Sequence, residues 1–205
     1  MDAIQTLIQE HRLILRVVEA LESYAEQVDR ERQVARDEVA DFVSFLAEFV
    51  DLCHHGKEEN VLFAALADAG FPTTSGPLAV MRTDHDRGRR LVRRIRELSE
   101  KAEAWDEADF ESFAGLARAY ADLLRDHIRR EDEVLYPMAE EHLSRAQQRH
   151  VEELFRLFEE QREAGRRHER LHGLAERLIE RHGRAGADRE PASRRSRPVP
   201  NCCGL

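Results

Sequence analysis

The sequence HHGKEENVLF, His54 to Phe63, has a second copy of its pattern in HIRREDEVLY, His127 to Tyr136. Each stretch begins with a histidine, has a glutamate four positions later and continues with Val-Leu and an aromatic residue. Side chains four positions apart lie on the same face of an α-helix. The repeat therefore predicts two equivalent helices, each presenting an imidazole and a carboxylate to one point.

A further histidine precedes each copy of the pattern. His11 stands 43 positions before His54, and His85 stands 42 positions before His127. Both His11 and His85 also follow an acidic residue. The chain is therefore interpreted as a duplicated two-helix unit, in which each half offers one histidine on its first helix and His-x-x-x-Glu on its second.

Apolar residues recur at helical spacing in four long stretches, which predicts four amphipathic helices. These stretches cover residues 2–29, 39–66, 78–104 and 108–141. A loop rich in Gly, Pro, Thr and Ser, Gly70 to Pro77, separates the halves, and Asp106 or Asp109 is the expected N-cap of the fourth helix. The prediction is an all-α fold, an up-down-up-down four-helix bundle over residues 1–142.

Two further segments follow the predicted bundle. Residues 143–182 show another helical pattern, interpreted as an additional C-terminal helix that packs outside the bundle. Residues 183–205 are rich in Arg, Ala, Ser, Pro and Gly without apolar periodicity. Such a composition buries too little apolar surface to offset the entropy of ordering, so a disordered tail is expected.

The repeated residues are typical metal ligands and fall on the apolar stripes of their helices, so they are expected to point inward. The six candidates are His11, His54, Glu58, His85, His127 and Glu131. Buried carboxylates without compensation cost several kcal/mol each, and a metal ion supplies the missing positive charge. Four nitrogen donors with two carboxylates suit two divalent first-row metals about 3.5–4 Å apart.

This order of His, His-x-x-x-Glu, His, His-x-x-x-Glu resembles the hemerythrin-like, or HHE cation-binding, proteins over roughly residues 1–142. The resemblance implies a non-haem di-iron centre, oxo- or hydroxo-bridged when oxidised, with zinc or manganese as substitutes. It also implies a protein that binds dioxygen, peroxide or nitric oxide, and leaves open whether it is an enzyme.

Two departures from the oxygen-carrying hemerythrins bear on function. The carriers have His-x-x-x-His on the third helix, whereas Arg89 stands four positions after His85 here, and Glu131 stands at i+4 where the carriers have Asp at i+5. One iron is then expected to lose a ligand. A centre with more open positions favours reaction with small oxidants over reversible oxygen carriage.

His55 and Glu59 also satisfy His-x-x-x-Glu, and only the repeat separates the two registers. The Val-Leu-aromatic sequence follows Glu58 and Glu131 at the same distance, so His54 and Glu58 are preferred.

Three other residues accompany the predicted site. Gly88, inside the third helix, leaves room either for a small ligand or for close helix packing. Asp51 precedes His54 by one turn and is a candidate to orient a ligand. Tyr120 is interpreted as a core residue with a hydrogen-bonded hydroxyl.

Composition excludes several functional classes. The net charge of -9 argues against nucleic acid as a partner, because such binding requires a basic face. No run of about 18 apolar residues occurs, and the N-terminus lacks a signal sequence, so neither membrane insertion nor export is expected and the predicted location is the cytoplasm. The oligomeric state is left open.

Weaker signals lie near the C-terminus and at the cysteines. His168 and His172 form an i, i+4 pair that is more typical of a solvated face than of a metal site. Cys53, Cys202 and Cys203 do not form a disulfide framework, and reduced thiols are expected.

Two alternative functions remain, an iron or oxygen sensor and a structural bundle that binds zinc.

Overall fold

The computed structural model describes residues 1–161 and 164–183, apart from the side chains of residues 159 and 161–168. Every regular element within this part of the chain is a helix. The elements are α1 (Asp2–Glu31), α2 (Arg36–Phe45), η1 (Leu46–His55), η2 (Glu58–Leu62), α3 (Phe63–Asp68), α4 (Gly76–Glu100), α5 (Glu107–Arg130), η3 (Glu131–Leu135), α6 (Tyr136–His142), α7 (Arg145–Gln161) and α8 (Ala164–His182). The three η segments are π-helical. The prediction of an all-α fold is confirmed.

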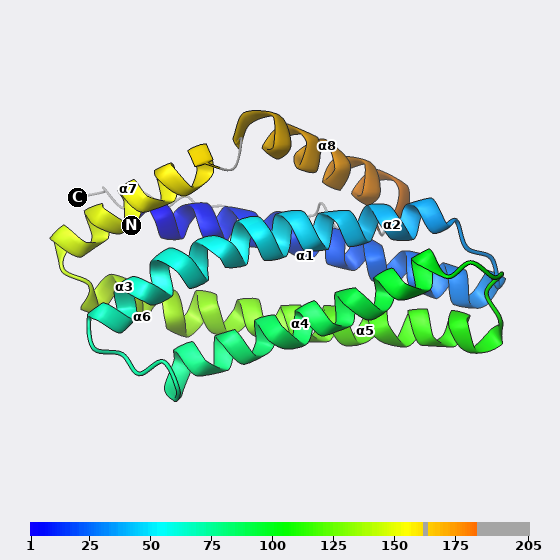
Figure 1. Ribbon diagram of the computed structural model, residues 1–205, viewed down its shortest axis with the longest axis horizontal. Coiled ribbons are helices and arrows are strands. Elements are labelled where there is room, and N and C mark those ends of the chain that lie inside the picture. Colours follow the sequence, from blue (N-terminus) through cyan, green and yellow to red (C-terminus); the bar gives the residue numbers. More distant parts are fainter. Residues whose placement is uncertain (162–163, 184–205) are drawn as a thin grey trace, which may run out of the picture.

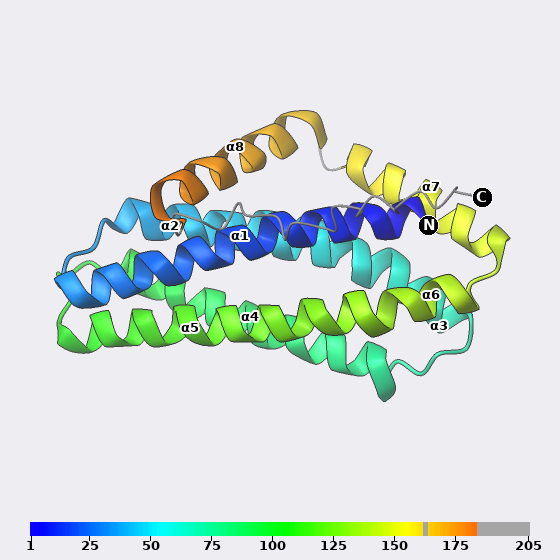
Figure 2. The same ribbon diagram turned by 180° about the vertical axis from the view of Figure 1, so that it is seen from behind.

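Four long helical segments pack side by side into a bundle. They are α1, the run from α2 to α3, α4, and the run from α5 to α6 (Figures 1 and 2). The start of α5 is closed by a capping box, in which the Asp106 carboxylate accepts from the Asp109 N–H and the Asp109 carboxylate accepts from the Asp106 N–H. Both candidate N-cap residues therefore take part.

The bundle has two separate apolar clusters, one toward each end. Along α1, Leu7 belongs to one cluster and Ile14 to the other, and His11 lies between them. Along α5 and η3, Leu124 and Leu135 belong to the two clusters in the same way. The predicted ligands thus occupy a polar belt that is closed above and below by packed hydrocarbon, which keeps bulk water from the belt.

The C-terminal extension differs from the prediction of one helix. It consists of α7 and α8, and each covers a different apolar cluster: Phe155 of α7 joins the cluster that contains Leu7, while Leu171 and Leu178 of α8 join the cluster that contains Ile14. Figure 2 shows α8 lying across α1 and α2. The apolar residues of the two helices thus pack against two separate surfaces of the bundle.

The expected disordered tail lies outside the described residues from position 184 onward, and Cys202 and Cys203 lie there too. Among the described residues, no helix combines the length and apolar character needed to cross a lipid bilayer.

Candidate metal centre

The π-helical segments carry several of the polar residues that face the interior. His54 and His55 end η1, Glu58 begins η2, and Glu131 begins η3. Successive residues of an α-helix point about 100° apart, so only one of two adjacent histidines would face the core. A π-helical turn is wider, and such turns are frequent at functional sites. Here both histidines are buried, with His54 at 1% and His55 at 3% exposure.

Four side chains from α1, η1, η2 and η3 converge at one point: His11, His54, Glu58 and Glu131, here called the His11 group. Their candidate donor atoms all lie within 4.8 Å of one another. Nε2 of His11 lies 3.0 Å from Nε2 of His54 and 3.3 Å from Oε2 of Glu131. All four side chains are buried, and together they could hold a metal ion.

A second cluster adjoins the first and consists of His55, Glu58, His85 and His127, here called the His85 group. Nε2 of His85 lies 3.1 Å from Nε2 of His127 and 3.4 Å from Oε2 of Glu58. Oε1 of Glu131 lies 3.2 Å from Nε2 of His127. Glu58 and Glu131 therefore both lie between the two groups, where each carboxylate has one group on either side.

The buried carboxylate oxygens test whether metal ions fit here. Both side-chain oxygens of Glu131 and Oε2 of Glu58 are buried without a hydrogen-bond partner among the described residues. Unpaired buried carboxylates are costly, whereas coordination to a cation offsets that cost. Imidazole nitrogens with shared carboxylates match first-row divalent metals. The residues thus fit a pair of metal ions.

The outward nitrogens of the same histidines are tied to carboxylates. The hydrogen bonds run from His11 Nδ1 to Asp132 at 2.8 Å, from His54 Nδ1 to Glu10 at 2.9 Å and from His85 Nδ1 to Glu59 at 2.6 Å. An ionised carboxylate only accepts, so each Nδ1 keeps its hydrogen and directs the lone pair of Nε2 into the centre. This arrangement orients the imidazoles as metal ligands.

The repeat extends to these supporting carboxylates. Lys57 pairs with Glu10, and Arg130 pairs with Asp84 at 2.6 Å. Asp84 in turn lies 3.8 Å from Nδ1 of His127. The signal for this layer was present in the sequence, since an acidic residue precedes His11 and His85 and another follows Glu58 and Glu131.

The pKa values describe the metal-free centre. Burial alone would lower the pKa of His11, but the hydrogen bond to Asp132 and the nearby Glu131 carboxylate outweigh it and raise the pKa to about 10. Burial is likewise outweighed at His127, where the charge of Glu131 and the nearby Asp84 carboxylate raise the pKa to about 9. Protons therefore occupy these nitrogens when cations do not.

His55 behaves in the opposite way and corrects the sequence interpretation. Burial, followed by the positive charge of His85, lowers its pKa to about 3, so His55 is neutral. Neither of its ring nitrogens makes a hydrogen bond among the described residues. The sequence offered His54 with Glu58 or His55 with Glu59 as alternatives, but the structure combines parts of both. His54, His55 and Glu58 all face inward, and the Glu59 carboxylate is hydrogen-bonded to His85. Asp51 lies 3.6 Å from Nδ1 of His55, and so accompanies His55 and not His54.

Arg89 was expected to leave one metal short of a ligand, and the structure places a further histidine in the same group. His55 completes a set of four side chains in the His85 group. The Arg89 guanidinium points to carboxylates, with Nε 2.7 Å from Asp51 and an Nη atom 2.7 Å from Glu59. Arg89 therefore holds the two acidic residues that face His55 and His85.

Tyr136 is a site residue that sequence reasoning missed. Its buried hydroxyl donates to Oε1 of Glu58 at 2.7 Å and lies 3.3 Å from Nε2 of His11. The equivalent residue of the other half is Phe63, whose ring stacks on His85. The two groups thus differ, because the His11 group is flanked by the Tyr136 hydroxyl and the His85 group contains a third histidine, His55. In the sequence, the only indication of this role was that Tyr136 occupies the aromatic position of the second copy of the repeat.

Two other expectations change with the structure. The Tyr120 hydroxyl, expected to be hydrogen-bonded, has no hydrogen bond among the described residues, and its side chain is 2% exposed. A Cβ at Gly88 would lie 3.6 Å from Cε2 of Tyr120, an ordinary contact, so close helix packing does not require a glycine here, and Gly88 instead lines a cavity. His172 packs edge-on against Phe49, and the His168 side chain lies outside the described residues.

The family comparison agrees with this geometry. The hemerythrin HHE cation-binding domain model matches residues 2–139, which include every candidate ligand described above. The chain therefore belongs to the hemerythrin HHE cation-binding family, and its His and Glu clusters are able to hold metal.

Curated relatives come from mycobacteria. The uncharacterized proteins Rv1995 of Mycobacterium tuberculosis and Mb2018 of Mycobacterium bovis are each 27% identical over 163 residues, covering 78% of this chain. The chain spans 63% of the length of these relatives. No solved structure matches the chain.

Proposed function

We propose that the His11 group and the His85 group hold two iron ions, and that the protein binds and reduces small oxidants, with hydrogen peroxide as the principal substrate. The supporting observation is the position of Glu58 and Glu131, whose buried, unpartnered oxygens lie between two sets of converging imidazole nitrogens. Carboxylates shared in this way are typical of two-metal sites in helical bundles, in which the four long segments would run alternately up and down.

The donor count favours reaction over storage of a ligand. Each group offers four side chains, and a first-row ion that accepts more ligands keeps positions open for an exogenous molecule. A pair of ferrous ions held by the two groups would supply one electron each, enough with two protons to reduce one peroxide to two waters.

The residues of the chain orient the imidazole ligands and keep a hydroxyl proton beside the centre. Burial raises the pKa of Tyr136 well above its ordinary value, and the charge of Glu58 adds to the effect. The hydroxyl therefore keeps its proton and remains a hydrogen-bond donor beside Glu58 and His11. Glu10, Glu59 and Asp132 hold the imidazoles, and the apolar clusters above and below exclude water.

Anaerobic titration of the iron-loaded ferrous protein with hydrogen peroxide tests this function. We expect the ferrous ions to be completely oxidised at one peroxide for every two ions, and absorption spectroscopy monitors the oxidation. Glu131→Ala should abolish this stoichiometry because it removes a carboxylate that faces both groups, whereas Glu133→Ala, an exposed neighbour, should leave it unchanged. Ferrous protein that persists in excess peroxide would contradict the proposal.

A further inference from the structure

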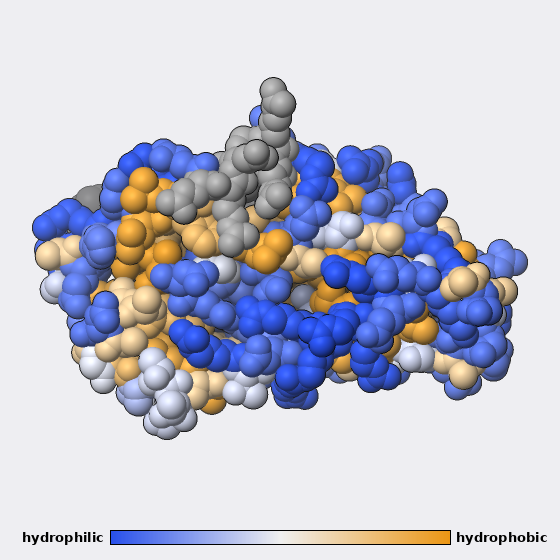
Figure 3. All heavy atoms as spheres, viewed as in Figure 1, coloured by the Kyte–Doolittle hydropathy of each residue, from blue (hydrophilic) through white to orange (hydrophobic). Residues whose placement is uncertain are grey.

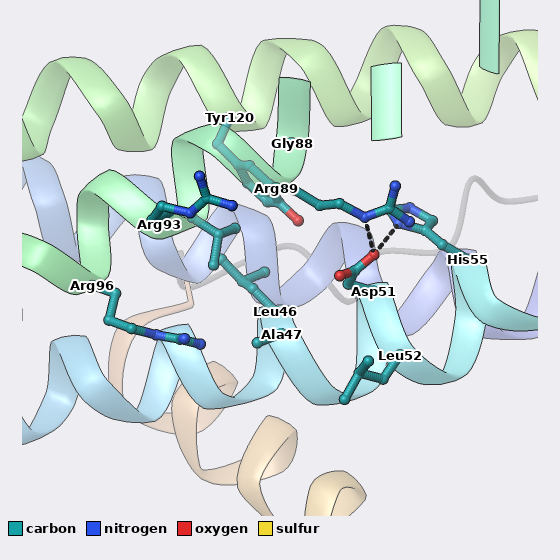
Figure 4. A pocket seen from close by; sticks show the side chains of 11 residues that line it. Leu46, Ala47, Asp51, Leu52, His55, Gly88, Arg89, Arg93, Arg96 and Tyr120 are labelled. Atoms are coloured by element: carbon teal, nitrogen blue, oxygen red, sulfur yellow. Dashed lines mark hydrogen bonds and ion pairs between the residues drawn. The ribbon is translucent and has the colours of Figure 1, made fainter. Parts of the chain in front are cut away.

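A cavity of about 330 Å³ lies between η1 and α4, beside Gly88 and His55 (Figure 4). We call it the Gly88 cavity. Its volume is at the lower end of the range for small-molecule sites, which are mostly apolar with a few placed polar groups. None of its lining residues except His55 belongs to the two candidate metal groups. The cavity is therefore a separate feature that adjoins the metal centre at one residue.

The inner end of the cavity has polar atoms without partners. Figure 4 shows the Tyr120 hydroxyl directed into the space between α4 and η1, with His55 and Asp51 farther along it. The Tyr120 side chain is 2% exposed and forms no hydrogen bond among the described residues. This hydroxyl lines the cavity and has no protein partner, so it is available to donate to a ligand that accepts a hydrogen bond.

The other end of the cavity is positively charged. Arg93 and Arg96 line it, both are exposed, and neither side chain makes a hydrogen bond or ion pair within the part of the chain that the structure describes. Arg89, which lies closer to His55, is already paired with Asp51 at 2.7 Å, so these two charges offset each other. Strongly hydrophilic side chains gather across the middle of this face in Figure 3. The mouth thus offers two guanidinium groups to an anion.

Apolar side chains form the wall between the two ends. Leu46 and Val92 are buried and Ala47 is half-buried, and all three line the cavity. Gly88 and Arg96 are eight positions apart on α4, which corresponds to roughly 12 Å along the helix axis. A ligand that uses both ends must therefore have an extended apolar middle between two polar groups.

We propose that the Gly88 cavity binds a small amphipathic organic anion, with its carboxylate at Arg93 and Arg96, its hydrocarbon chain along Leu46 and Val92, and a hydrogen-bond-accepting far end at the Tyr120 hydroxyl. At about 30 Å³ for each water-sized group, the volume holds roughly eleven non-hydrogen atoms. An ω-hydroxyoctanoate has this size, this charge and these two polar ends. The proposal concerns binding and does not depend on which metal the centre holds.

Titration calorimetry of the full chain with ω-hydroxyoctanoate tests the site, in both the metal-free and the metal-loaded protein. Binding with one site per chain is expected in both forms. The double variant Arg93→Ala/Arg96→Ala should weaken binding about tenfold or more, because charge-assisted hydrogen bonds to the carboxylate are lost. The matched control is Arg90→Ala/Arg94→Ala, which removes the same charge from exposed positions of α4 outside the cavity and should change affinity less than about twofold.

Two ligand comparisons examine the inner end. Tyr120→Phe should weaken ω-hydroxyoctanoate severalfold and leave octanoate unchanged, since octanoate has no far-end hydroxyl. The uncharged diol of the same length should bind more weakly than ω-hydroxyoctanoate to the parent protein. Absence of binding heat at millimolar ligand in both forms would show that the cavity holds only water. Equal losses in the two double variants would show that the carboxylate is not bound by Arg93 and Arg96. Either result would overturn the proposal. Binding by metal-free protein would stand even if the peroxide titration failed.

Discussion

The ring of His55 stacks on the ring of His85, with centroids 3.8 Å apart and planes inclined by 15°. His55 has no counterpart in the duplicated sequence, because Ile128 stands at the equivalent position of the second copy. The two halves of the chain are therefore related by a repeat but build unequal groups, one with Tyr136 and the other with an additional histidine.

Replacing His55 separates metal binding from stability. His55→Leu should lower metal content by removing a donor of the His85 group, while the His11 group keeps its four side chains. The same change should raise the free energy of unfolding of the metal-free protein by about 1–2 kcal/mol, since an unpartnered buried imidazole is lost. Elemental analysis and denaturant titration measure the two effects. His142→Leu, at an exposed position, is the control, and unchanged metal content in His55→Leu would exclude His55 as a ligand.

The raised pKa values of His11 and His127 predict that the stability of the metal-free protein depends on pH more strongly than that of the metal-loaded protein. Both histidines have an ordinary pKa of 6.5, raised to about 10 and about 9 in the folded, metal-free protein. Their protonation stabilises that form fully below about pH 6.5, and the stabilisation is lost as pH rises through 9 to 10. Metal must displace these protons, so metal affinity should increase over the same interval.

Denaturant unfolding at several pH values checks this expectation. The midpoint of the metal-free protein should fall between pH 6.5 and pH 10, and that of the metal-loaded protein should fall less. Parallel curves for the two forms would mean that the metal and these protons do not compete for the same nitrogens.

The sequence predicted six interior ligands because they repeat with α-helical spacing, and all six lie in the two groups. It treated His55 only as the alternative to His54, because two adjacent residues do not share one face of an α-helix and the π-helical turns of η1 were not visible in the apolar pattern. The sequence showed Arg89 only as a position without a histidine. Its pairing with Asp51 and Glu59 could not be predicted, because it depends on how two helices approach each other.

Gly88→Ala tests how the glycine contributes to packing. The new Cβ would lie 3.6 Å from Tyr120 and 3.9 Å from Leu123, both ordinary contacts, so the methyl group fits. Alanine stabilises a helix interior by about 1 kcal/mol relative to glycine, which corresponds to a rise in Tm of about 2–4 °C for a chain of this size. Differential scanning calorimetry of the metal-free protein measures it. A fall in Tm would indicate that the backbone of α4 must approach α5 more closely than the structure shows.

Asp132→Asn tests the carboxylates that hold the imidazoles. The hydrogen bond of 2.8 Å to Nδ1 of His11 loses its charge, and removal of such partners lowers metal affinity by about tenfold or more. Glu133→Gln removes the same charge at the next, exposed position and serves as control. Competition with a chelator gives the affinities, and equal values for the two variants would show that Asp132 does not orient His11.

The number and identity of metal ions per chain test the central claim most directly. Elemental analysis of protein produced with iron in excess should give close to two iron ions per chain, falling sharply in Glu131→Ala because that carboxylate faces both the His11 group and the His85 group. Protein that holds zinc in preference to iron under these conditions, or that binds one ion or none, would contradict the assignment of a di-iron centre.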